Sequence, residues 1–148
     1  MADFWLVSDK PVRSSQTDAT NLTETPDDVA GDLESLVGDW LTVPDAAEQL
    51  GVPLSKVRQY LADREVLSAR IGPRRVPSVP AKFFDTSGPR PELKGTFTVL
   101  ADGGMDDDEI IEWLFTPDPT LPVDGAPIDA LRAGHKTEIR RRAQELAF

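Results

Sequence analysis

The sequence lacks cysteine altogether and has a single histidine, His135, among its 148 residues. The absence of cysteine excludes disulfides, thiolate metal ligands and a cysteine nucleophile. One histidine is too few for an imidazole-rich metal site. Because the chain also shows no nucleophile–base pair and no glycine-rich phosphate loop, we expect a protein that is not an enzyme and that uses no metal and no cofactor.

Long apolar runs are also missing. None approaches the roughly 18 residues that a bilayer-spanning helix needs. The apolar patch Phe4–Val7 is short and has no basic region before it, so it is not typical of a signal peptide. We therefore expect no membrane partner and a cytoplasmic location.

Positive charge is scarce, and it is unevenly distributed in a chain with a formal net charge of −10. Residues 1–39 have nine acidic and two basic side chains, and residues 86–148 have twelve acidic and seven basic ones. Only residues 40–85 are net positive, with seven basic and five acidic side chains. Because DNA binding depends on local potential and not on total charge, this central part is where a polyanion would bind.

The N-terminal part is rich in serine, threonine, aspartate and proline and has almost no apolar periodicity. Such a segment cannot bury enough surface to offset the entropy lost on ordering. We therefore predict a disordered acidic tail over residues 1–32. Helical spacing begins after it, over residues 33–41, at Leu33, Leu36, Val37, Trp40 and Leu41.

Residues 41–61 predict two short helices joined at a glycine; their sequence is LTVPDAAEQLGVPLSKVRQYL. Pro44 suits the first turn of a helix, and Gly51 suits the left-handed position that ends one. Ala47 is small enough for the close approach of two helices, and Val57 can reach back into the core from the second helix, over about residues 54–63. This pattern is typical of a helix-turn-helix, although other helical hairpins share it.

Two short apolar runs follow, Val66–Ile71 and Val76–Val79, on either side of Gly72–Arg75. Glycine and proline between two such runs predict a β-hairpin. A helix pair followed by a hairpin indicates a winged helix-turn-helix, which we place over residues 33–86.

Residues 87–148 predict a C-terminal helical domain with helices near 93–100, 106–115, 128–133 and 137–146. The run Asp106–Glu109 stands at the start of one of them, where carboxylates cap the helix and complement its dipole without a metal. The basic run KTEIRRR near the C-terminus places Lys136, Arg140 and Arg141 along one helix side, where they either contact phosphate or form a solvated face or pair with nearby acids. The predicted fold class is therefore mainly α: a winged helix-turn-helix with a small β-hairpin and a C-terminal helical module.

The stretch LTVPDAAEQLGVPLSKVRQYLADREVLSARIGPRRVPSVPAKFF resembles the winged helix-turn-helix domains of the excisionase and MerR-like type. Its LGV turn and its ARIGPRR wing carry the likeness. It departs at Pro53, where those domains often have a serine or threonine cap, whose loss costs about 1 kcal/mol. Together with the acidic tail and the run EIIEWLFTPDPTLP, it resembles a small actinobacterial DNA-binding protein family.

The resemblance implies that double-stranded DNA is the partner and that the protein regulates transcription. The second helix would lie in the major groove, where Arg58 suits guanine, Gln59 suits adenine and Lys56 meets phosphate. Arginines of the wing would contact phosphates or enter a minor groove. The predicted DNA-binding residues are Ser55, Lys56, Arg58, Gln59, Arg70, Arg74 and Arg75.

A mycobacterial member of that family is a substrate of a membrane Ser/Thr kinase in its N-terminal tail. The resemblance therefore implies a Ser/Thr protein kinase as a second partner, and phosphate would make the tail more negative. No motif selects one acceptor among the tail threonines. The candidates are Thr17, Thr20, Thr23 and Thr25.

A different function remains open from the C-terminal sequence. The run EWLFTPDPTLPVDGAPIDALRAG is similar to the toxin-binding domain of certain antitoxins. That likeness implies a protein-interaction module whose C-terminal helices hold a protein partner, with DNA contact secondary.

Overall fold

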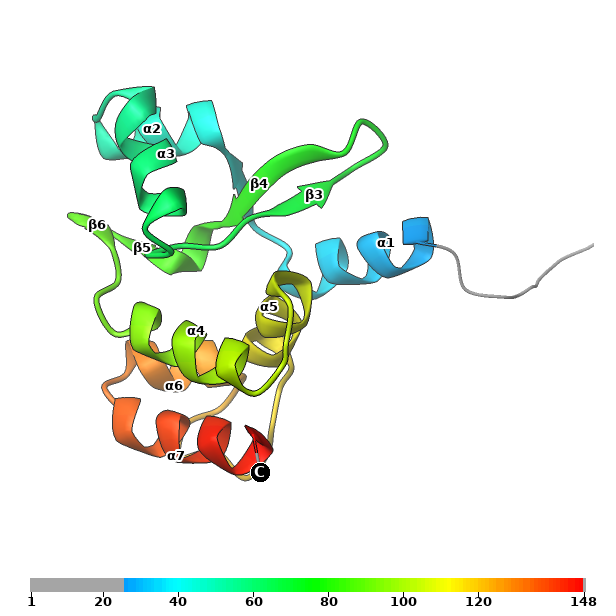
Figure 1. The fold of residues 1–148 in the computed structure, drawn as a ribbon, viewed down its shortest axis with the longest axis vertical. Coiled ribbons are helices and arrows are strands. Elements are labelled where there is room, and N and C mark those ends of the chain that lie inside the picture. Colours follow the sequence, from blue (N-terminus) through cyan, green and yellow to red (C-terminus); the bar gives the residue numbers. More distant parts are fainter. Residues whose placement is uncertain (1–25, 148) are drawn as a thin grey trace, which may run out of the picture.

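The structure, a computed structural model of the chain, describes residues 26–147 (Figure 1). Its helices are α1 Pro26–Val37, α2 Val43–Leu50, α3 Leu54–Ala62, α4 Leu93–Asp102, α5 Asp107–Phe115, α6 Pro127–Arg132 and α7 Lys136–Ala147. Its strands are β2 Trp40–Thr42, β3 Ala69–Ile71, β4 Val76–Pro80, β5 Phe84–Asp85 and β6 Gly88–Pro89, with a 3-10 turn η2 at Ala81–Phe83. The predicted class, mainly α with a small hairpin and a C-terminal helical module, is confirmed. Among residues 26–147, no helix is both long and apolar enough to cross a bilayer.

The first half is built on a three-stranded antiparallel sheet in the order β2-β4-β3. Ile71 pairs with Val76 across the hairpin, and Trp40 pairs with Pro80 on the other side of β4. The α2–α3 pair stands at one end of this sheet, and the β3–β4 hairpin extends away from it (Figure 1). The predicted hairpin is confirmed, although its first strand is shorter than expected. Val66 and Leu67 are buried ahead of that strand instead of joining it.

Helix α1 corrects the predicted extent of the tail. We expected disorder up to residue 32, but α1 begins at Pro26, so residues 26–32 are helical. The sequence Pro-Asp-Asp is favoured at a helix start, because proline needs no N–H bond there and carboxylates complement the dipole. These local preferences and the packing of Leu33, which is buried, outweigh the low apolar content. Residues 1–25 of the predicted tail lie outside the described residues.

Strand β2 corrects the predicted helix over residues 33–41. The helix ends before Gly38, whose φ of 79° is left-handed, and the chain then pairs with β4 through Trp40–Thr42. The Trp40 indole N–H donates back to the Glu34 carbonyl at 3.1 Å and fixes this bend. A strand of three residues is too short for periodicity to distinguish it from the end of a helix.

The second half is a group of four helices, with α4 and α7 side by side (Figure 1). They approach closely at Gly95, where the guanidinium of Arg140 fills the space that a larger residue would need. Asp106 accepts a hydrogen bond from the Glu109 N–H at 2.9 Å, and Glu109 accepts one from the Asp106 N–H at 2.9 Å. The predicted capping role of the Asp106–Glu109 run is therefore confirmed.

One continuous core joins the two halves. The ring of Phe83, from η2, lies 5.3 Å from that of Phe97 in α4 and 5.8 Å from that of Phe115 in α5. Beside this cluster, the Lys82 ammonium donates to Asp129 at 3.0 Å. Partial burial alone would raise the pKa of Asp129, but hydrogen bonds from the Ala126 N–H and from Lys82 hold it below its usual range. The C-terminal helices are thus packed directly against the base of the winged half.

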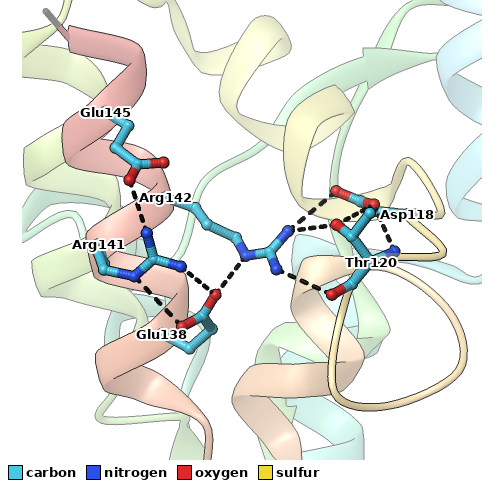
Figure 2. Close-up of polar contacts among 6 residues, drawn as sticks. All are labelled: Asp118, Thr120, Glu138, Arg141, Arg142 and Glu145. Atoms are coloured by element: carbon cyan, nitrogen blue, oxygen red, sulfur yellow. Dashed lines mark hydrogen bonds and ion pairs between the residues drawn. The ribbon is translucent and has the colours of Figure 1, made fainter.

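Two of the four basic residues of the run on α7, Arg141 and Arg142, pair with acids, as Figure 2 shows. Arg141 contacts Glu138 at 2.6 Å and Glu145 at 2.6 Å. Arg142 contacts Glu138 at 2.7 Å and also reaches the loop after α5, where it donates to the Thr120 hydroxyl at 2.7 Å. Hydrogen bonds from Arg141 and then Arg142 lower the pKa of Glu138. Of the two interpretations of this run, pairing with acids is confirmed for these two arginines.

Candidate nucleic-acid interface

Helix α3 turns its polar face to solvent because its apolar residues fill the core. Val57 is fully buried and Tyr60 is 9% exposed, next to the buried Ala46 and Ala47 of α2. Gly51 ends α2 with a φ of 69°, as the predicted turn requires. The side chains predicted to face DNA are all exposed: Ser55, Lys56, Arg58 and Gln59.

Two of these side chains have partners one turn further along α3. The Lys56 ammonium lies 5.5 Å from the centre of the Tyr60 ring, and the Gln59 amide donates to Asp63 at 3.0 Å. Contacts of this kind at exposed sites stabilise a protein by only about 0.5–1 kcal/mol, so a stronger ligand can replace them. Asp63 was not predicted as part of this face, although its spacing of four residues from Gln59 places it one turn away.

Pro53, where the sequence departs from the excisionase and MerR-like domains, stands at the start of α3. This residue occupies the N-cap position with a φ of −63° and supplies no side-chain hydrogen bond. The predicted loss of the cap is therefore confirmed. The first N–H groups of α3, which have no partner within a helix, are left without a side-chain acceptor.

The wing carries the other three predicted residues, Arg70, Arg74 and Arg75, and all are exposed. Arg70 lies on β3 and donates to the Arg75 carbonyl at 3.2 Å, so its side chain braces the turn. Gly72 and Arg75 both have left-handed backbones, with φ of 79° and 56°. The structure thus brings Arg70 and Arg75 together, and it places the α3 residues on a separate element.

Arg64 is a basic residue of this half that the sequence did not single out. It follows α3 and forms an ion pair with Asp107 of α5 at 2.9 Å. Because 43 residues separate these two side chains, no local signal could have linked them. The candidate phosphorylation sites Thr17, Thr20, Thr23 and Thr25 lie outside the described residues.

Comparison with known proteins shows the family of the chain. A family model described as "DNA-binding protein Rv2175c, wHTH domain" matches residues 27–84, and one described as "Rv2175c C-terminal domain of unknown function" matches residues 91–147. A Mycobacterium tuberculosis protein named "DNA-binding protein Rv2175c" is 43% identical over 117 residues, covering 72% of this chain and 79% of that protein. The chain belongs to the Rv2175c family.

The NMR structure of Rv2175c has the same fold, with a TM-score of 0.64 and 37% identity over 74% of this chain and 81% of that one. The resemblance to a small actinobacterial winged helix-turn-helix family is thereby confirmed. All seven residues predicted to face DNA fall within the segment matched by the wHTH model of the Rv2175c family, residues 27–84.

Proposed function

We propose that this member of the Rv2175c family binds double-stranded DNA through the exposed face of α3 and the β3–β4 hairpin, and that it regulates transcription. One observation carries the proposal. The polar and basic side chains of the wHTH segment point to solvent from the two elements that such domains use on DNA, helix and wing.

The α3 residues differ in the contacts that their shapes allow. Arg58 has no competing hydrogen bond among the contacts described for α3, and its guanidinium fits the two acceptors of guanine. Gln59 must leave Asp63 to pair with adenine, and the carboxylate of Asp63 repels phosphate near the end of the helix. Lys56, which lies over the Tyr60 ring, would meet phosphate at the groove edge.

The basic contacts of α3 and the wing predict DNA binding that weakens as the salt concentration rises. Acidic parts of the molecule repel the DNA beyond the few basic contacts. Since one helix-turn-helix reads few base pairs, high specificity would require a dimer or a cooperating protein.

The N-terminal tail can regulate this binding through its charge. Phosphorylation of a tail threonine by a Ser/Thr kinase would add negative charge that either occupies the basic face or repels DNA. Deleting residues 1–25 should therefore tighten DNA binding at low salt and change it little at high salt. A fluorescence-anisotropy titration of both chains measures this, and equal low-salt affinities would remove the tail from the mechanism.

The antitoxin-like alternative has less support, because the run that resembles a toxin-binding domain serves the protein's own core. Leu121, Ile128 and Leu131 of this run are buried. Its loop is held to α7 by Arg142, which donates to the Thr120 carbonyl at 3.0 Å (Figure 2). A segment engaged in this way is not free to wrap around a partner protein, which favours DNA binding as the proposed function.

Replacing Arg74 and Arg75 by alanine tests the role of the wing. If both contact phosphates, the double variant should bind most duplexes about ten-fold more weakly, and the slope of log affinity against log salt should fall by about 1.8. Electrophoretic mobility shifts over a salt series provide both quantities. The matched control replaces Lys94 and Lys136, two exposed residues of the C-terminal domain, by alanine, so its net charge equals that of the wing variant. A salt slope equal to that of the wild type would contradict the wing assignment.

A further inference from the structure

The first turn of α5 contacts the winged half of the molecule through Asp107, and the acid Asp108 follows it. Asp107 accepts hydrogen bonds from the Arg64 guanidinium at 2.9 and 3.5 Å. Asp108 lies close enough to Arg75 of the wing for that positive charge to lower its pKa. Partial burial and the neighbouring Asp106 and Asp107 act more strongly and raise the pKa of Asp108 overall, so this turn holds unfavourably crowded negative charge.

Both arginines are held in an unusual backbone conformation. Arg64 has a φ of 58° and Arg75 a φ of 56°, and among residues 26–147 they are the only non-glycine residues with positive φ. The left-handed region costs free energy for a residue with a side chain, and such residues cluster at binding sites and switches. Arg64 therefore makes its ion pair with the start of α5 from a backbone conformation that the fold maintains at a cost.

Arg64 stands at the edge of the proposed DNA surface. It follows Asp63, the residue that binds Gln59 of the recognition face. Its side chain is 46% exposed and that of Asp107 is 43% exposed, so water reaches the ion pair. Exposed pairs contribute little to stability. A phosphate offers a guanidinium the same paired acceptor oxygens as a carboxylate, so DNA can replace Asp107 as the partner of Arg64.

The two acids are not needed to begin their helix. Asp106 and Glu109 make both hydrogen bonds of the capping box, while Asp107 and Asp108 add only their charge to the first turn. The negative charge extends beyond them, because Asp108, Glu109 and Glu112 line an open groove of about 610 Å³ against α1. The C-terminal domain thus places a cluster of acidic side chains at the start of α5, of which Asp107 contacts Arg64.

We propose that Arg64 is a further phosphate-binding residue and that Asp107 competes with DNA for it, so that the C-terminal domain restrains DNA binding. This inference rests on the proposed DNA-binding function. It gives the C-terminal domain a role, because its Asp107 occupies, in the free protein, the place that a DNA phosphate takes in the complex.

The test uses the full chain and a short duplex of mixed sequence in low salt. Asp107→Asn with Asp108→Asn should tighten binding about three- to ten-fold and steepen the salt slope, because Arg64 becomes available to phosphate and the acidic charge beside it falls. The control, Asp102→Asn with Asp124→Asn, makes the same change in net charge at exposed acids elsewhere in the C-terminal domain. It should change the affinity less than about two-fold.

A third variant separates competition from a general effect of charge. Arg64→Ala should weaken binding about two- to five-fold, and in the Asp107→Asn, Asp108→Asn background it should remove much of the gain. The inference would be overturned if the Asp107→Asn, Asp108→Asn variant and its control bound DNA equally well, or if Arg64→Ala had no effect. In either case, DNA binding by the wild-type chain would leave the proposed function intact. If the wild-type chain binds no duplex at any salt concentration, both proposals fail.

Discussion

Replacing Phe83 by alanine should destabilise the protein by about 3–5 kcal/mol, the cost of emptying a large buried aromatic site. The ring is fully buried and contacts Phe97 and Phe115, so the variant loses both the burial of the ring and its tilted aromatic contacts. Since Phe83 belongs to the winged half and its two partners to the C-terminal half, the damage falls on the joint between them.

Urea denaturation followed by circular dichroism measures this effect as a shift of the midpoint. Phe83→Leu retains most of the apolar volume and should cost about 1–2 kcal/mol. Val76→Ala, at a residue that is 39% exposed, should cost at most about 0.5 kcal/mol. A loss below about 1 kcal/mol for Phe83→Ala would mean that the two halves do not depend on this cluster. If the two halves of the Phe83→Ala variant unfold in separate transitions, the aromatic cluster couples their unfolding in the wild type.

Much of this fold could be predicted because its signals are local. Pro44 and Gly51 bound α2 by their own backbone preferences, and the spacing of Val57 and Tyr60 gives the inner face of α3. The cap at Asp106 follows from the residue type and from a glutamate three positions later. The outward position of the polar α3 residues follows from the same periodicity.

The parts that the sequence did not predict depend on distant residues. Strand β2 exists because β4 offers it a partner 40 residues later, as Trp40 pairs with Pro80. The Arg64–Asp107 ion pair depends on how α5 packs against the winged half. The hydrogen bond from Gln59 to Asp63 is local, but whether it forms depends on rotamers that residue types leave open. Periodicity identifies the α3 residues that face solvent, whereas their contact with DNA depends on a partner molecule and stays a prediction.

Reversing the charge of Lys56 and Arg58 should weaken DNA binding by on the order of 100-fold at moderate salt, or about 2.7 kcal/mol. Lys56→Glu with Arg58→Glu removes two cations from the α3 face and adds two anions next to Asp63. Phosphates would then meet repulsion where they now meet attraction. Both side chains are exposed, so the melting temperature should change by only a few degrees, mainly through loss of the Lys56–Tyr60 contact.

The matched control is Lys94→Glu with Lys136→Glu, which lowers the net charge by the same amount, from −10 to −14. These lysines lie exposed on α4 and at the start of α7, outside α3 and the hairpin, so their reversal should weaken binding less than about five-fold through long-range repulsion. Anisotropy titrations at two salt concentrations distinguish the cases, because direct phosphate contacts change the salt slope and distant charges change it little. If both pairs weaken binding equally, α3 does not face the DNA. The hairpin arginines would then have to carry the contact alone.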